Sequence, residues 1–364
     1  MTFLISLFFL LQTPQAQAED LSLKRSWSRR LISTDQIQKT SVFQTLKPVL
    51  LPEKKVLQGS SYGDLYLINK YGRKKLLYHA PEGLSGSPSV KGDFAFVGLQ
   101  NKSALALNYK TKKVLWKITL DSAPTAISDV KDGLIFIQTE SGSLYSLGAG
   151  DGAVNWKAQY KGSKELNIYG DPKPILFGPD IIAGFESGHV VKLKQKSGKV
   201  LWERLLPGGR KYSDVQYLTL GQNGRSVIAG VFDEAVYRLD LVTGAVQWQA
   251  FDKPVSGFGV DTDHIYFSSA AGEIIKLRQS TGTLIKKSKP FKGVGGVPIV
   301  LDNSLIVIDS KGPVFQIDKN TFEYSSLYEF FHNVSSSITF DKSMDALYVL
   351  TNKGYVFRMK VFKN

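Results

Sequence analysis

Residues 141–156 read SGSLYSLGAGDGAVNW, and variants of this pattern recur along the chain. A Gly-containing turn precedes alternating apolar residues that end at Leu147, and Trp156 follows nine residues later. The clearest further copies end at Trp116, Trp202 and Trp248. Alternation of apolar and polar residues over such short runs predicts half-buried β-strands that are separated by tight turns.

The Leu-type position marks the register of the repeat, and eight residues occupy it. They are Ile68, Leu107, Leu147, Leu193, Leu239, Leu277, Ile317 and Met359. Successive members lie 38 to 46 residues apart. A period near 40 with short strands and Gly-rich turns is typical of four-stranded propeller blades, each of which covers its neighbours' apolar faces. The sequence therefore predicts an all-β fold, an eight-bladed β-propeller.

One period has room for four strands. In the third copy we expect an inner strand at 125–129, a second at 134–139, a third at 143–147 and an outer strand at 153–159. The eighth copy reaches the C-terminus before its outer strand. The segment 21–33, LSLKRSWSRRLIS, resembles an outer strand with no third strand before it. We predict that this N-terminal strand closes the ring on the C-terminal blade, where an open edge would invite aggregation.

On this alignment all five Trp residues of the chain share one position on an outer strand. They are Trp27, Trp116, Trp156, Trp202 and Trp248. The weaker copies place Leu77, Lys286 and Ser326 there instead. A large ring that repeats at one register is expected to pack between blades, so we interpret the Trp residues as structural blade-docking residues.

The N-terminus has the features of an export signal. Residues 3–11 form an apolar run, and Ala16-Gln17-Ala18 is a small-x-small cleavage pattern. We predict a signal peptide at 1–18 and a single propeller domain at 19–364. The chain contains no Cys, which excludes disulfides, thiolate metal sites and a lipidated Cys in this sequence.

The formal net charge is +14. An exported chain with this charge would meet anionic lipid head groups and acidic protein faces rather than nucleic acid. Alternatively, scattered Lys residues keep a β-rich protein in solution without any specific partner.

Thr243-Gly244 with Trp248, and Ser197-Gly198 with Trp202, resemble the PQQ-type propeller repeat. Two longer stretches are similar to the BamB family of outer-membrane protein assembly factors. Residues 165–193 resemble the family's Leu-x-Leu-Arg-Gly segment with its following blade, and 211–220, KYSDVQYLTL, resembles its Arg-x-x-Asp-Val-Asp segment.

The resemblance implies a non-catalytic periplasmic scaffold, monomeric and peripheral to the outer membrane, that binds POTRA domains of the barrel-assembly protein. Carried over by position, the partner-binding residues are Leu166, Ile168, Tyr169 and Asp214. Tyr169 replaces the family's Arg, and Gln216 replaces its second acid. The connection that holds the first three residues is long, which suits a binding loop.

Two other functions stay open from the residues themselves. A PQQ-dependent dehydrogenase or quinone-binding protein needs a ring-stacking pocket, a calcium ion and a carboxylate base. With every Trp assigned to outer strands and no metal-ligand spacing among the four His residues, we expect no cofactor, no metal and no enzyme activity. A propeller that binds envelope polymers through its basic surface is the second alternative.

Overall fold

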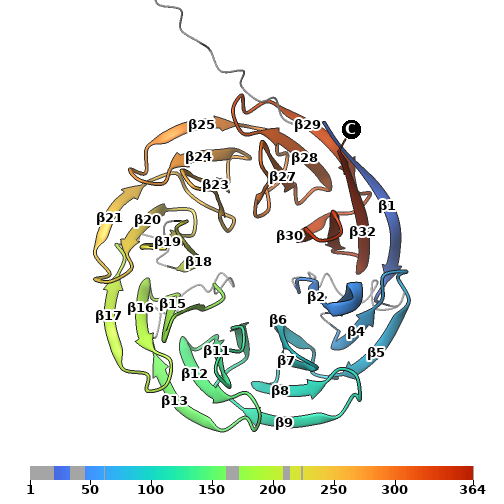
Figure 1. The fold of residues 1–364 in the computed structure, drawn as a ribbon, viewed down its shortest axis with the longest axis vertical. Helices are drawn as coiled ribbons and strands as arrows, with labels where there is room; N and C mark the ends of the chain where they lie inside the picture. The colour runs from blue at the N-terminus through green and yellow to red at the C-terminus, as the bar shows by residue number, and fades with distance from the viewer. Residues whose placement is uncertain are drawn as a thin grey trace, which may run out of the picture.

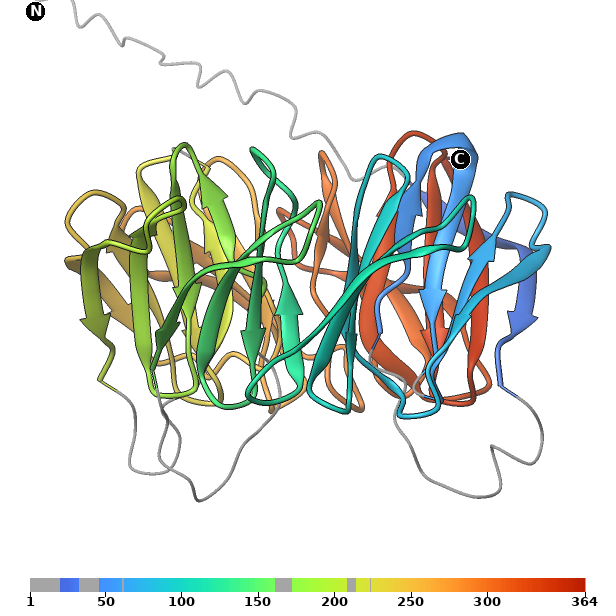
Figure 2. The ribbon, with the colours of Figure 1, turned by 90° about the horizontal axis from the view of Figure 1, so that it is seen from below.

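The computed structural model describes residues 20–32, 46–60, 62–160, 172–207, 214–222 and 224–363. These residues form eight four-stranded antiparallel sheets, arranged as blades around a central axis (Figure 1). Seen from the side, the strands of each blade run between the two faces of a disc (Figure 2). The prediction of an all-β, eight-bladed propeller is confirmed.

Blades are numbered in chain order from the first inner strand. Blade 1 contains β2 (Val49–Leu51), β3 (Lys55–Gly59), β4 (Asp64–Ile68) and β5 (Lys74–His79), with a 3-10 helix, η1 (Pro52–Lys54), between its first two strands. Blade 2 contains β6 (Leu84–Lys91), β7 (Phe94–Leu99), β8 (Ser103–Asn108) and β9 (Val114–Thr119). Blade 3 contains β10 (Pro124–Ile127), β11 (Leu134–Thr139), β12 (Ser143–Gly148) and β13 (Val154–Gln159). Blade 4 contains β14 (Ile175–Phe177), β15 (Asp180–Gly184), β16 (His189–Lys194) and β17 (Val200–Leu205).

The second half of the ring repeats this order. Blade 5 contains β18 (Val215–Leu220), β19 (Ser226–Val231), β20 (Ala235–Asp240) and β21 (Val246–Ala250). Blade 6 contains β22 (Gly259–Val260), β23 (His264–Ser268), β24 (Ile274–Arg278) and β25 (Leu284–Ser288). Blade 7 contains β26 (Ile299–Val300), β27 (Ser304–Ile308), β28 (Pro313–Asp318) and β29 (Tyr324–Glu329). Blade 8 contains β30 (Val334–Asp341), β31 (Ala346–Thr351), β32 (Tyr355–Lys363) and β1 (Leu21–Arg30).

The strands expected in the third copy are all present as blade 3. The second strand has the predicted bounds, and the third and outer strands differ from prediction by one residue. The inner strand begins at Pro124, one residue earlier than expected, and ends at Ile127, two residues earlier than expected. Pro at the first position of an inner strand costs no ladder hydrogen bond, which explains why the strand can include it.

The ring closes as predicted, because β1 pairs with β32 although the two strands lie at opposite ends of the chain (Figure 1). The antiparallel register runs from Leu21 opposite Lys363 to Arg30 opposite Tyr355. Leu21 and Leu23 are buried in one core cluster with residues of blades 7 and 8. The N-terminal strand therefore contributes both ladder hydrogen bonds and apolar contacts to the last blade.

The five Trp side chains make the same contact at five junctions between blades. Each indole Nε1–H donates to the backbone carbonyl two residues beyond the register residue of the next blade. The pairs are Trp27 to Lys70 (2.9 Å), Trp116 to Ala149 (3.0 Å), Trp156 to Gln195 (2.8 Å), Trp202 to Leu241 (3.1 Å) and Trp248 to Gln279 (3.0 Å). A buried indole N–H needs such an acceptor. Each Trp therefore packs between two blades, and its hydrogen bond fixes the orientation of the ring.

A glycine in the next blade's outer hairpin receives each ring. Gly244 has φ +68°, and a Cβ there would lie 2.6 Å from Trp202 Cδ2. The same contact pairs Gly72 with Trp27. Only Gly combines the left-handed backbone with room for the ring, so the Gly-turn and Trp elements of the repeat are two halves of one contact.

Candidate partner-binding surface

The predicted binding loop joins two blades at one face of the ring. We call this end the connection face: there, the outer strand of each blade leads into the inner strand of the next. Leu166, Ile168 and Tyr169 lie outside the described residues. The chain on either side is described, up to Tyr160 after β13 and again from Pro172 before β14.

The start of the connection is held against blade 4. The Tyr160 ring packs on Phe185 at 4.7 Å between centroids and on His189 at 5.5 Å. Its backbone N–H donates to the Gly142 carbonyl at 2.8 Å. These contacts fix Tyr160, the last described residue before the connection, at the connection face.

The two stretches singled out from the sequence meet at Gly184, the last residue of β15. A Cβ on Gly184 would lie 2.6 Å from a Val215 methyl and 3.2 Å from Pro172 Cγ. Pro172 is the first described residue after 161–171 in the first stretch, and Val215 directly follows Asp214. The absence of a side chain at Gly184 therefore lets the described ends of both stretches approach one another.

Asp214 immediately precedes β18 and is mostly buried, with 7% of the residue exposed. Its carbonyl accepts a hydrogen bond from the Phe232 N–H at 3.1 Å. Gln216, which stands at the second acidic position of the family segment, is 6% exposed. Both residues are thus mostly buried, and little of Asp214 is open to a partner.

Several large apolar side chains are exposed at the same face. Phe331 is 97% exposed after β29, Phe251 is 70% exposed after β21, and Leu205 is 58% exposed at the end of β17. Each lies where one blade leads into the next. Exposed aromatic and aliphatic side chains of this kind are the ones from which protein interfaces build their central contacts.

A cavity of about 470 Å³ lies among the inner strands, lined by residues of blades 1, 2, 3 and 8 with Lys173. Lys173 forms an ion pair with Asp129 at 2.6 Å. The surrounding protein desolvates the Lys47 ammonium and, with repulsion from Lys173, lowers its pKa. Among the described residues that line this cavity there is no aromatic ring, and Asp129 is the only carboxylate. These described residues therefore do not fit a stacked quinone with a calcium ion beside it.

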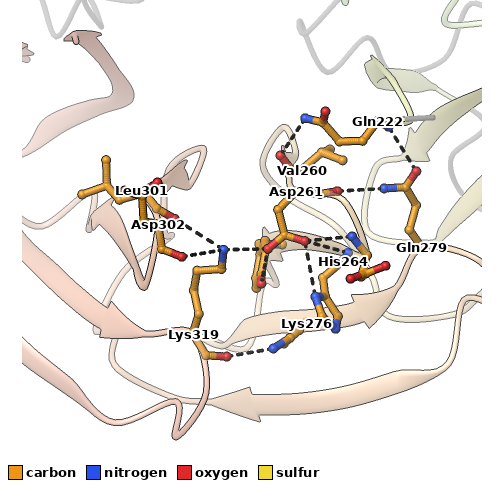
Figure 3. Close-up of polar contacts among 11 residues, drawn as sticks. Gln222, Val260, Asp261, His264, Lys276, Gln279, Leu301, Asp302 and Lys319 are labelled. Carbon is orange, nitrogen blue, oxygen red and sulfur yellow. Dashed lines mark hydrogen bonds and ion pairs between the residues drawn. The ribbon is translucent and has the colours of Figure 1, made fainter. Parts of the chain in front are cut away.

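A polar cluster of the described residues joins blades 6 and 7 (Figure 3). Lys319 Nζ lies 2.7 Å from one Asp261 oxygen, and the Tyr266 hydroxyl donates to the same oxygen at 2.9 Å. Burial alone would raise the pKa of Asp261, but these hydrogen bonds and one from the His264 N–H outweigh it and lower the pKa to about 2. The carboxylate is thus ionised and satisfied at neutral pH.

This cluster stands at a junction where the outer strand has Lys286 in place of Trp. Lys276, opposite Lys286 in the sheet, donates to the Lys319 carbonyl at 2.8 Å, the acceptor that an indole binds at the other junctions. Lys286 donates to the Asn320 carbonyl at 2.7 Å. The cluster is therefore a structural connection between blades rather than a catalytic site.

Sequence reasoning missed these basic residues, although the repeat contains their signal. Lys or Arg precedes the register residue in four copies, namely at Lys192, Arg238, Lys276 and Arg358. Three of them donate to a backbone carbonyl of the next blade: Lys192 to Leu241, Arg238 to Gln279 and Lys276 to Lys319. Arg358 instead donates to the Ser26 hydroxyl in β1, the outer strand of its own blade. In three of the four copies, a cation before the register residue thus marks a bond to the outer hairpin of the next blade.

Within the described ranges, no group of three or more His, Asp or Glu residues is placed to hold a metal ion. No helix of that part of the chain has the length and apolar character needed to cross a bilayer.

Comparison with known proteins assigns the chain to a family. The family model described as outer membrane protein assembly factor BamB matches residues 24–231 and 232–323. The BamB of Yersinia pestis is 26% identical over 236 residues, which are 63% of this chain and 60% of that protein. The BamB of Escherichia coli is 26% identical over 263 residues, which are 57% of this chain and 67% of that protein. The chain thus matches about three fifths of the Yersinia pestis protein's length.

Solved structures agree on the fold. The crystal structure of BamB from Moraxella catarrhalis has a TM-score of 0.78 at 18% identity and covers 93% of this chain and 99% of its own. The computationally designed Ika8 protein reaches 0.68 at 13% identity, covering 89% of this chain and 97% of its own, so the propeller alone does not select a function. It is the family model, which matches most of the sequence, that places this chain in the BamB family of outer-membrane protein assembly factors.

Proposed function

We propose that this protein is a non-catalytic scaffold that supports the assembly and insertion of outer-membrane β-barrel proteins. The observation that carries the proposal is the family match from residue 24 to residue 323. The curated relatives are named as assembly factors, and the described residues that line the inner cavity include none of the aromatic rings on which a quinone would stack. A rigid closed ring suits a scaffold, because its connections can be displayed at fixed positions.

The partner we propose is the POTRA region of the barrel-assembly protein, bound at the connection face between blades 3 and 5. Leu166, Ile168 and Tyr169 would supply apolar anchors, and Asp214 would contribute at the edge. Support comes from the approach of Pro172 and Val215 around Gly184, which brings the described ends of both stretches together. The exposed Phe251 and Leu205 at this face extend the apolar surface.

In this account the protein works as a monomer in the periplasm, at the inner surface of the outer membrane, after cleavage of residues 1–18. Export would follow from the apolar run at 3–11 and the Ala16-Gln17-Ala18 site.

Gene deletion with complementation tests the function. Loss of the protein should reduce the amount of folded β-barrel proteins in the outer membrane, measured by their heat-modifiable electrophoretic mobility. The wild-type chain should restore that amount, whereas a chain with Leu166→Ser, Ile168→Ser and Tyr169→Ser should not. Unchanged barrel levels in the deletion strain would contradict the proposed function, and full rescue by the variant would contradict the proposed site alone.

A further inference from the structure

Positive charge is concentrated on one part of the outer wall of the propeller. We call this surface the basic rim: it consists of β1 and of residues 69–75, which form the hairpin into β5. Its cations are Lys24, Arg25, Arg29, Arg30, Lys70, Arg73, Lys74 and Lys75. Neither segment contains an acidic residue, and the nearest acids along the chain are Asp20 and Asp64. These 17 residues therefore have a net charge of +8, whereas the net charge of the whole chain is +14.

The two segments form one continuous surface, since β1 and β5 are neighbours on the outer wall (Figure 1). Arg29 Nε donates to the Gly72 carbonyl at 2.6 Å. Lys74 Nζ donates to the Arg30 carbonyl at 2.7 Å. Together with the Trp27 contact to Lys70, these bonds hold the cations of blades 8 and 1 side by side.

Five cations of the basic rim are not neutralised by carboxylates of the described residues. Among the described residues, Lys24, Arg25, Lys70, Arg73 and Lys75 form no ion pair with Asp or Glu. Some instead lie over aromatic rings, with Lys24 Nζ at 5.2 Å from the centre of the Phe362 ring and Lys70 Nζ at 4.9 Å from that of Tyr71. Contacts with carbonyls and rings leave the full positive charge facing outward.

A shallow groove of about 420 Å³ adjoins this surface. It is lined by Glu53, Lys54, Lys55, Asn69, Lys70 and Tyr71. Lys55 pairs with Glu53 and lowers the pKa of that carboxyl, which leaves Lys54 and Lys70 as the uncompensated charges of the groove. Tyr71 is 64% exposed. Two ammonium groups beside a phenol and an amide match the donors that a phosphate oxygen accepts.

We propose that the basic rim binds the surface of an anionic phospholipid bilayer, with a headgroup phosphate seated in the groove beside Tyr71. The cations are spread over two strands rather than gathered around one point, which fits a plane of repeated phosphates better than a single small anion. Long Lys and Arg stems and an exposed Tyr are residue types that favour the lipid interface. This outer wall is separate from the connection face, so the proposal does not depend on the proposed partner.

Co-sedimentation with vesicles tests this. The full chain without residues 1–18 is mixed with vesicles of phosphatidylglycerol and phosphatidylcholine, or of phosphatidylcholine alone, at low and at raised salt. The rim variant carries Arg25→Gln, Arg73→Gln and Lys75→Gln, whose side chains are exposed. The control variant loses the same charge at exposed positions of blades 2 and 4, through Lys113→Gln, Lys196→Gln and Lys199→Gln.

The wild-type chain and the control variant should bind the anionic vesicles, and salt should weaken both. The rim variant should bind on the order of a hundredfold more weakly, because three cations near an anionic surface are removed. Equal losses in the two variants would overturn the assignment to the rim, leaving only net charge. Failure of the wild-type chain to prefer anionic vesicles, with binding of an anionic polysaccharide instead, would overturn the lipid partner.

Discussion

Removing the Trp27 side chain tests how the ring is closed. The indole is 8% exposed, packs 6.1 Å from the Tyr348 ring centre and donates to the Lys70 carbonyl of blade 1 at 2.9 Å. Truncation of a buried Trp to Ala removes about 3 to 5 kcal/mol of unfolding free energy. Trp27→Phe keeps most of the packing and loses the hydrogen bond, so its cost should be about 1 kcal/mol.

A double-mutant cycle with Gly72 isolates the contact between blades. Gly72 has φ +79°, and a Cβ there would lie 2.9 Å from Trp27 Cδ2. Gly72→Ala should therefore destabilise the wild type through both backbone strain and collision with the ring. In the Trp27→Ala background only the strain of about 1 to 2 kcal/mol remains.

Urea unfolding followed by circular dichroism measures each free energy. Val114→Ala, at an exposed outer-strand position, is the control and should stay within about 0.5 kcal/mol of the wild type. A loss below about 1 kcal/mol for Trp27→Ala, or additive effects in the cycle, would refute the packing argument.

Three further predictions follow from the same structure. Asp261→Asn should lower the unfolding free energy by about 2 kcal/mol at pH 7, because the pKa of Asp261 is about 2 in the folded protein and 3.8 ordinarily. This loss should be complete above pH 3.8 and should disappear as the pH falls through about 2. A loss that does not change with pH would argue against the pairing with Lys319. Removal of residues 19–35 takes away β1 and should lower both the melting temperature and the solubility, so a truncated chain as stable and soluble as the full one would contradict closure by this strand. Purified protein supplied with pyrroloquinoline quinone and calcium should show neither a bound-quinone spectrum nor dye-linked oxidation of alcohols or sugars, and stoichiometric binding with turnover would overturn the scaffold function.

The repeat made most of the fold predictable from the sequence. Apolar alternation before each register residue gave the strands, and the Trp27 segment, which has no third strand of its own, indicated how the ring closes. These features are local, or repeat at a fixed period, so a single sequence contains enough copies to reveal them. The shared Gly and Trp positions also have one physical cause, the seating of an indole on a hairpin glycine.

Other features depend on contacts that the repeat does not encode. In the Trp blades, the residue before the register residue pairs with the Trp, as Ala106 does with Trp116. In blade 1 the alignment placed Leu77 at the Trp position, but the residue before the register residue, Leu67, pairs with Lys75. The difference arises because the β-bulge of this outer strand lies further from its hairpin. Likewise, Asp261 of blade 6 pairs with Lys319 of blade 7, and neither residue belongs to the Gly-turn and Trp pattern of the repeat. Such arrangements are set by which side chains meet across a junction.

The candidate partner site was accessible to sequence reasoning only through family resemblance. Leu166, Ile168 and Tyr169 lie in a connection outside the periodic strands, where neither alternation nor turn spacing constrains the residues. The resemblance also implied a partner contact for Asp214, but only 7% of that residue is exposed. Its burial depends on how the blades pack, which a single sequence does not show.

Direct binding between purified components tests the central claim. Isothermal titration of the chain with the POTRA region of the same organism's barrel-assembly protein should yield a saturable complex. The combined Leu166→Ser, Ile168→Ser and Tyr169→Ser variant should keep the wild-type melting temperature and lose affinity by at least about tenfold. A matched control, with Val114→Ser, Leu115→Ser and Val154→Ser at exposed outer-strand positions, should bind like the wild type. No measurable binding by the wild-type chain, or wild-type affinity in the loop variant, would contradict the account.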